Sequence, residues 1–187
     1  MELHEFGKIT TRNCKELLLR RLNRNHAKAL QDFNRNLSAK SNRWFRPHGY
    51  DDLVVNKFLA RSEAGDDLTL GLFQGSRIVG YFFLWYLRER VPLLGIGLSD
   101  EFQGQGLGRE MMTLLLKEAE KAGCEAVELT TDMDNERAFA LYKKVGFIYY
   151  KDVENVQGDG KLVTERAMYY PIKSGAAPMN KPHCPPV

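Results

Sequence analysis

The chain has 187 residues and a formal net charge of +3, with 43% hydrophobic and 27% charged residues. This composition predicts one globular domain with its own core, and it excludes a disordered chain. The longest apolar run, at residues 78–87, is about half of the ~20 residues that span a bilayer. No apolar signal segment begins the chain. We therefore expect a cytoplasmic protein with no membrane partner.

Strand and helix patterns alternate along residues 1–173, which we predict to form the single domain. In chain order the expected elements are strands at 7–12 and 16–22 joined by a turn around Asn13, helices at 24–37 (with Asn23 as N-cap) and 51–61, strands at 67–73, 77–87 and 91–99, a helix at 108–123, a strand at 126–131, a helix at 135–145, and strands at 147–153 and 165–172. Residues 38–50 are expected to form a loop or a short helix.

This order, ββααβββαβαββ, predicts an α/β fold of the α+β type. We expect a mixed, mostly antiparallel sheet of about seven strands with about four helices. Residues 174–187, SGAAPMNKPHCPPV, are rich in proline and small residues and are predicted to form a flexible C-terminal tail.

Cysteine and histidine spacing predicts neither a disulfide framework nor a metal site. The three cysteines, Cys14, Cys124 and Cys184, are odd in number and far apart. The four histidines are scattered without the spacing of metal ligands. We therefore expect chemistry that needs no metal.

Three glycines, Gly104, Gly106 and Gly108, stand directly before the helix predicted at 108–123. A glycine-rich turn into a helix N-terminus exposes backbone N–H groups and the positive end of the helix dipole, which together favour a phosphate. A tight turn alone would need only one glycine. The segment lacks the Gly-Lys-Ser/Thr ending of a P-loop, and the G-x-G-x-x-G dinucleotide pattern fails because Arg109 and Met111 occupy the last position.

Residues 103–108, QGQGLG, match the Q/R-x-x-G-x-G/A signature, and the chain here resembles the GCN5-related N-acetyltransferases (GNAT). GIGLSDEF before the signature and AVELTTDMDNERAFALYKKVGF after it are similar to the neighbouring strands and helix of that family. The resemblance is specific over about residues 68–150. It implies an enzyme that transfers an acetyl group from acetyl-CoA to a primary amine, by direct attack in a ternary complex.

The resemblance also implies roles for individual residues. Tyr142 matches the usual general acid that faces the thiol sulfur. The positions that match acyl-CoA contacts, through the pyrophosphate or the pantetheine arm, are Leu98, Gln103, Gly104, Gln105, Gly106, Leu107, Gly108, Arg109 and Asn135.

The general base stays open at this point. Several relatives carry a glutamate in the strand that matches residues 91–99, but VPLLGIGLS contains no carboxylate. Glu89, Asp132 and His48 are substitutes that the sequence does not rank, and deprotonation through water is a further alternative. The acceptor amine is also open, because residues 38–50 and 151–161, which set it in this family, carry no interpretable signature.

Two other classes of function are considered. A domain that binds acyl-CoA without catalysing transfer is consistent with the missing strand carboxylate. A nucleic-acid-binding module would use residues 1–61, which carry 13 Lys and Arg against 6 Asp and Glu, with Trp44 and Phe45 as stacking residues. Acidic residues interrupt this region at Asp32, Asp51 and Asp52, so a nucleic-acid partner is disfavoured. A homodimer is left open.

Overall fold

The computed structural model describes residues 5–10, 16–179 and 185–186. Its helices and strands are β1 (Glu5–Thr10), β2 (Glu16–Arg21), α1 (Ala27–Arg35), α2 (Ala39–Trp44), α3 (Asp52–Ala64), β3 (Leu68–Gln74), β4 (Arg77–Trp85), β5 (Leu93–Leu98), α4 (Leu107–Lys121), β6 (Ala126–Asp132), α5 (Glu136–Val145), β7 (Ile148–Val156) and β8 (Leu162–Pro171). Two 3₁₀ turns, Arg24–His26 and Asp100–Phe102, precede α1 and the glycine segment.

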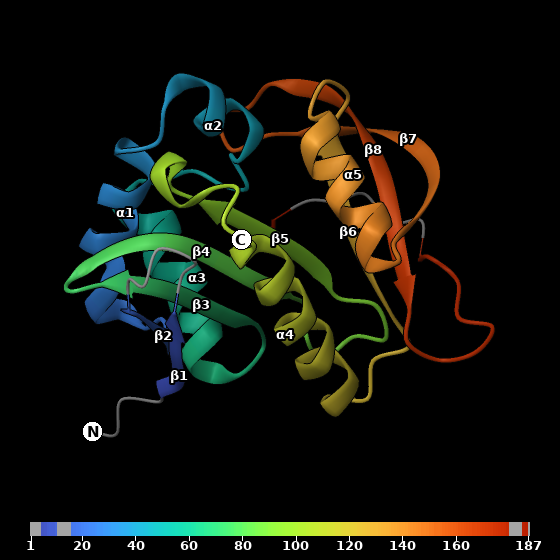
Figure 1. The fold of residues 1–187 in the computed structure, drawn as a ribbon, viewed down its shortest axis with the longest axis horizontal. Helices are drawn as coiled ribbons and strands as arrows, with labels where there is room; N and C mark the ends of the chain where they lie inside the picture. The colour runs from blue at the N-terminus through green and yellow to red at the C-terminus, as the bar shows by residue number, and fades with distance from the viewer. Residues whose placement is uncertain (1–4, 11–15, 180–184, 187) are drawn as a thin grey trace.

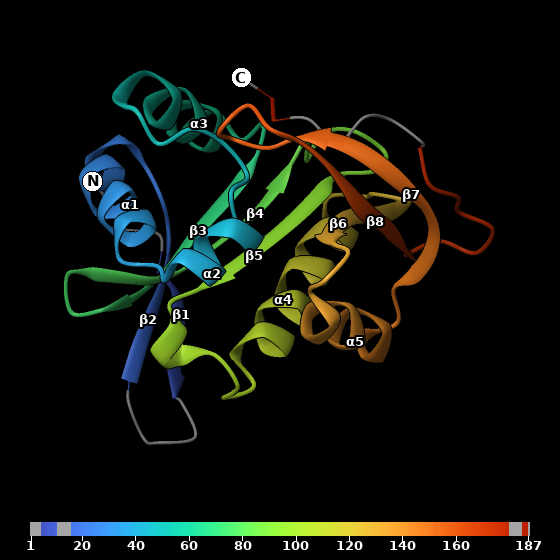
Figure 2. The same ribbon diagram turned by 90° about the horizontal axis from the view of Figure 1, so that it is seen from above.

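One eight-stranded sheet has the order β1-β2-β3-β4-β5-β6-β8-β7, and every neighbouring pair is antiparallel except β5 and β6. Helices α1 and α3 cover one face, and α4 and α5 cover the other (Figures 1 and 2). On the α1/α3 face the core includes Phe33, Phe58 and Tyr81. On the α4/α5 face it includes Met111 and Tyr142.

The predicted fold class and the order of its elements are confirmed. The described part of the chain has eight strands rather than about seven, and five α-helices rather than about four. The additional helix is α2, which lies within residues 38–50 and is capped by the Ser38 hydroxyl. Asn23 accepts a hydrogen bond from Asn25 N–H and caps the first helical turn, as predicted. Asn13 lies outside the described residues, and so do Cys14 and Cys184.

The strands β5 and β6 separate soon after they meet, and this split positions the site. Their only paired residues are Leu93 and Glu128, so β5 has no partner on that side from Leu94 to Leu98. On its other edge, β6 pairs with β8 over its whole length. The two halves of the sheet therefore diverge (Figure 2), and a wedge opens between them.

Two absences apply to the described residues. None of their helices is long and apolar enough to cross a bilayer. They contain no group of three His, Cys, Asp or Glu side chains that could hold a metal ion. Cys124 is a buried free thiol.

One contact involves residues 174–187, the predicted C-terminal tail. The backbone N–H of Met179 donates to the carboxylate of Glu128, a residue that is only 1% exposed. We expect deletion of residues 174–187 to lower the melting temperature more than deletion of residues 180–187, because only the longer deletion removes this donor from a buried charge. A hydrogen bond to a charged group contributes ~1.5–3 kcal/mol, which corresponds to a shift of several degrees. Equal melting temperatures would show that this contact is not stabilising.

Candidate active site

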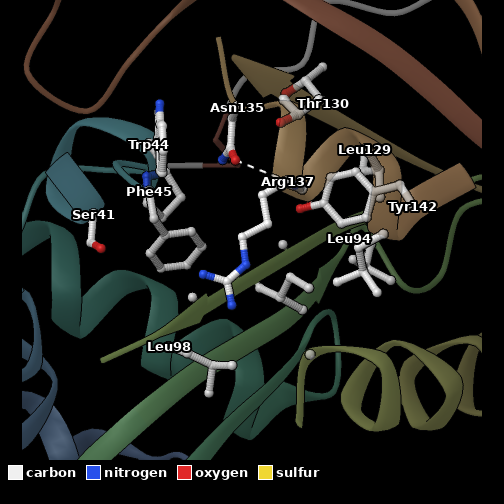
Figure 3. A pocket seen from close by; sticks show the side chains of 18 of the residues that line it. Ser41, Trp44, Phe45, Leu94, Leu98, Leu129, Thr130, Asn135, Arg137 and Tyr142 are labelled. Carbon is white, nitrogen blue, oxygen red and sulfur yellow. Dashed lines mark hydrogen bonds between the residues drawn. The ribbon is translucent and has the colours of Figure 1, made fainter. Parts of the chain in front are cut away.

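A cleft of about 570 Å³ opens at the split between β5 and β6. Its walls come from β5, from the glycine segment that leads into α4, from β6 and α5, and from the chain that follows α2. Segments far apart in the sequence therefore meet here, on both sides of the divergence of the sheet (Figure 3).

Backbone groups of β5 form one wall. Ser99 N–H donates to Val79 of β4 at 2.9 Å, and Pro92 C=O accepts from Glu128 of β6 at 3.0 Å. Because alternate residues of a strand direct their N–H and C=O groups to opposite sides, Ile96 and Leu98 direct theirs into the split. Leu98, a position that matches an acyl-CoA contact, therefore presents its backbone to the cleft.

The N-terminus of α4 forms the second wall. Gly106 is its N-cap, with φ = +89°, and no side chain caps this end. The first backbone hydrogen bond of the helix runs from Glu110 N–H to Gly106 C=O, so Leu107, Gly108 and Arg109 have N–H groups without a partner in the helix. By contrast, side chains of Asp51 and Asn135 cap α3 and α5. The glycine segment is therefore suited to hold an anion at an open helix end.

Other residues of this segment support its shape. The side chain of Gln103 donates from Nε2 to Leu98 C=O and to Ser41 Oγ, both at 3.0 Å. The backbone N–H of Gln103 donates to Asp100 C=O. Gln105 donates to Glu101 C=O at 2.8 Å, and the Leu107 side chain lies in the core. Among the residues predicted from 103 to 109, Gln103, Gly104, Gly106, Gly108 and Arg109 line the cleft.

Arg137 is a cleft residue that the sequence did not single out. It lies in the first turn of α5, and its Nη2 is 2.9 Å from the place that a Cβ at Gly104 would take. It has no ion pair or hydrogen bond with any described residue. A cation beside an open helix N-terminus adds to the attraction for phosphate. The only signal in the sequence is its spacing, two residues after Asn135.

Tyr142 and Asn135, both on the α5 side, line the cleft. The Tyr142 hydroxyl points into the cleft (Figure 3) and has no hydrogen bond with a described residue. Burial, and then the charge of Glu165, raise the pKa of Tyr142 above its ordinary value of 10.0. The hydroxyl therefore stays protonated at neutral pH. Asn135 Oδ1 accepts from Ala138 N–H at 3.2 Å, which leaves its amide nitrogen for a ligand.

The structure separates the three candidate bases. His48 is 1% exposed and outside the cleft, and its ring nitrogens contact Tyr81 Oη at 3.0 Å and Gly49 C=O at 2.6 Å. Burial lowers the pKa of His48 to about 4. Glu89 lies on the turn after β4 and does not line the cleft. Asp132 ends β6 beside the cleft.

A carboxylate that the sequence did not single out, Glu165 of β8, lines the cleft and pairs in register with Asp132. Burial and the charges of Glu165 and Asp134 raise the pKa of Asp132 to about 6. Asn155 of β7 donates to Glu165 Oε2 at 2.7 Å. Only the β6–β8 pairing brings these two carboxylates together.

Asp132 destabilises the fold when it is ionised. Its native pKa of about 6 exceeds the ordinary value of 3.8, so stability falls as pH rises from 3.8 to about 6. We expect Asp132→Asn to raise the free energy of unfolding by about 1 kcal/mol at pH 7.5, allowing for solvent screening of this half-exposed group, and to change it little at pH 3.5. Urea unfolding at both values measures this, and an equal effect at both would contradict it.

The chain that follows α2 closes one end of the cleft. Trp44 Nε1 donates to Asp134 Oδ1 at 2.9 Å, on the loop before α5. On the other side, Gly158 N–H donates to Arg46 C=O at 3.0 Å, and Arg46 forms an ion pair with Asp159. Residues 38–50 and the β7–β8 loop are thus joined over the split.

Comparison with known proteins identifies relatives of this chain. Over 119 residues it is 27% identical to the [ribosomal protein bS18]-alanine N-acetyltransferase of Escherichia coli K12, a match that covers 64% of this chain and 72% of that protein. It is 43% identical over 53 residues to the mycothiol acetyltransferase of Paenarthrobacter aurescens, but this covers only 28% of this chain and 16% of that protein.

The fold is also shared with solved structures. That of yncA from Salmonella typhimurium, solved with its cofactor acetyl-CoA, superposes with a TM-score of 0.69 at 16% identity and covers 88% of this chain and 99% of that chain. The family model described as "Acetyltransferase (GNAT) family" matches residues 32–147, more than half of the sequence. The chain therefore belongs to the GNAT family of acetyltransferases.

Proposed function

We propose that this protein is an N-acetyltransferase that moves an acetyl group from acetyl-CoA to a primary amine. The observation that carries the proposal is the open N-terminus of α4 at the split between β5 and β6. The open N–H groups after Gly106, with Arg137 beside Gly104, suit a pyrophosphate, and the free edge of β5 suits the amides of a pantetheine arm. The yncA structure, of the same fold, holds acetyl-CoA.

The demands of the chemistry match the groups in the cleft. A lysine-like amine has a pKa of ~10.4, so about one in a thousand is neutral at pH 7, and the site needs a group that takes a proton. An N–H group of β5 directed into the split would polarise the thioester carbonyl. The ordinary pKa of a tyrosine hydroxyl already exceeds that of a thiol, and burial raises the pKa of Tyr142 further, so its hydroxyl would stabilise the leaving thiolate mainly as a hydrogen-bond donor.

The experiment has two parts. Calorimetric titration with acetyl-CoA tests donor binding. Release of free CoA is then followed with protein N-terminal peptides, lysine peptides, polyamines, aminoglycosides and arylalkylamines as acceptors. Binding followed by turnover supports the proposal. Binding without turnover on any amine would instead indicate an acyl-CoA sensor, and an absence of binding would contradict both.

A further inference from the structure

Glu165 has the position of a proton acceptor on the face of the sheet opposite to Tyr142. We propose that the acceptor is a primary amine on an apolar group, that it binds on the α1/α3 face of the sheet between the rings of Phe45 and Phe83 and the Glu165 carboxylate, and that Glu165 takes its proton. This inference rests on the proposed function and names a base for it.

The register of β8 places Glu165 on that face. Its neighbour Arg166 donates to Glu136 Oε1 of α5 at 2.5 Å and lies over the Phe139 ring of α5 at 4.4 Å. Arg166 therefore faces α5. Because successive strand residues point to opposite faces, Glu165 points to the face of α1 and α3, and it still lines the cleft.

One oxygen of Glu165 is held and the other is available. Asn155, which is 6% exposed, donates to Oε2 at 2.7 Å. No described residue donates a hydrogen bond to Oε1. Asn155 thus acts as a positioning residue that orients the carboxylate and leaves Oε1 for an ammonium or amine proton.

The opposite wall on this face is aromatic. A Cβ at Gly95 would overlap the Phe83 ring, and a Cβ at Gly97 would overlap the Phe45 ring, so both rings lie directly against β5. Phe83 stacks on Trp85 at 3.9 Å. Both rings line the cleft and offer apolar contact to the carbon skeleton of an acceptor. An aromatic wall opposite one carboxylate favours an apolar primary amine over a polyamine.

Protons move between the acceptor, Glu165 and solvent. Glu165 takes a proton from the ammonium and passes it to solvent. The neutral nitrogen attacks the thioester carbonyl carbon, Glu165 takes the second N–H proton and releases it to solvent, and the C–S bond breaks. The departing thiolate is stabilised by a hydrogen bond from the Tyr142 hydroxyl and takes its proton from solvent. The products are the amide, CoA as the free thiol and one proton in solution.

The test compares Glu165→Gln with wild type on two acetyl acceptors, phenethylamine, which is an ammonium ion at pH 7, and aniline, which is already neutral. General base catalysis contributes ~10²–10⁴-fold, so we expect kcat/KM for phenethylamine to fall at least about 100-fold. The rate with aniline should fall far less, and the Kd for acetyl-CoA should not change. Loss of a merely structural contact would lower both rates equally.

Matched variants complete the design. Glu154→Gln, on the exposed side of the same hairpin and outside the cleft, should leave both rates unchanged. Equal wild-type and Glu165→Gln rates with phenethylamine would overturn the role of Glu165, and a loss confined to Asp132→Asn would assign the proton to Asp132. Turnover of polar amines but not of phenethylamine would overturn the apolar acceptor site. Failure of wild type on every amine would instead contradict the proposed function.

Discussion

Gly106→Val is expected to abolish binding of acetyl-CoA while the protein stays folded. Gly106 has φ = +89° at the open end of α4, where a branched Cβ would cover the N–H groups that the phosphates need and would strain the backbone. Strain of this kind costs ~1–3 kcal/mol, less than the ~5–15 kcal/mol by which a domain is stable. Calorimetric titration with acetyl-CoA, with circular dichroism to verify the fold, measures the result.

The control for strain is Gly123→Val. Gly123 follows the other end of α4, also has positive φ (+83°), and has no heavy atom within 4 Å of its Cβ position. This variant should lose similar stability and still bind acetyl-CoA with wild-type affinity. Wild-type affinity in Gly106→Val would show that the glycine segment is only a tight turn.

Tyr142→Phe is expected to lower the single-turnover rate of acetyl transfer about 100-fold, the lower end of general acid catalysis. Phenylalanine keeps the ring in its place beside Phe147, at 6.1 Å, and removes only the hydroxyl that points into the cleft (Figure 3). The low end is expected because a thiolate is already a fair leaving group, and because the raised pKa of Tyr142 makes full proton transfer unfavourable.

Affinity for acetyl-CoA should change little in this variant, because the hydroxyl acts mainly on charge that develops during the reaction. Tyr170→Phe is the matched control. Tyr170 packs on the other side of Phe147 at 5.6 Å, does not line the cleft, and should keep the wild-type rate. If the Tyr142→Phe rate agrees with wild type within about twofold while chemistry limits, Tyr142 is a core residue and another group serves the thiolate.

Features that depend on neighbours in the chain could be predicted from the sequence. Such features are the N-cap at Asn23, the helix end at Gly146, the glycine segment before α4, and the order of strands and helices. Each depends on propensity, capping or a positive φ within a few residues, so local physics suffices. The sequence leaves residues 38–50, which contain α2, as a loop or a short helix, because six residues with one polar cap carry a weak local signal.

Which side chains face one another in the cleft depends on contacts between distant segments of the chain. Glu165 faces the acceptor side only because β8 pairs with β6 in one register, and a shift of one residue would exchange it with Arg166. The burial of β8 does not alternate cleanly between its two faces, so its sequence pattern could not assign that face. His48 looked available in the sequence, yet packing against Phe58 at 4.1 Å and Tyr81 removes it from the site.

The sequence by itself therefore determined the groups on the acetyl-CoA side of the cleft, namely the glycine segment, the open N-terminus of α4 and Tyr142. A helix N-terminus and the turn before it are one continuous segment, so local signals suffice to predict them. Only the tertiary structure decided the acceptor side. There Phe45, Asn155 and Glu165 meet across more than a hundred residues, and long-range strand pairing and the split of the sheet set which side chains face one another.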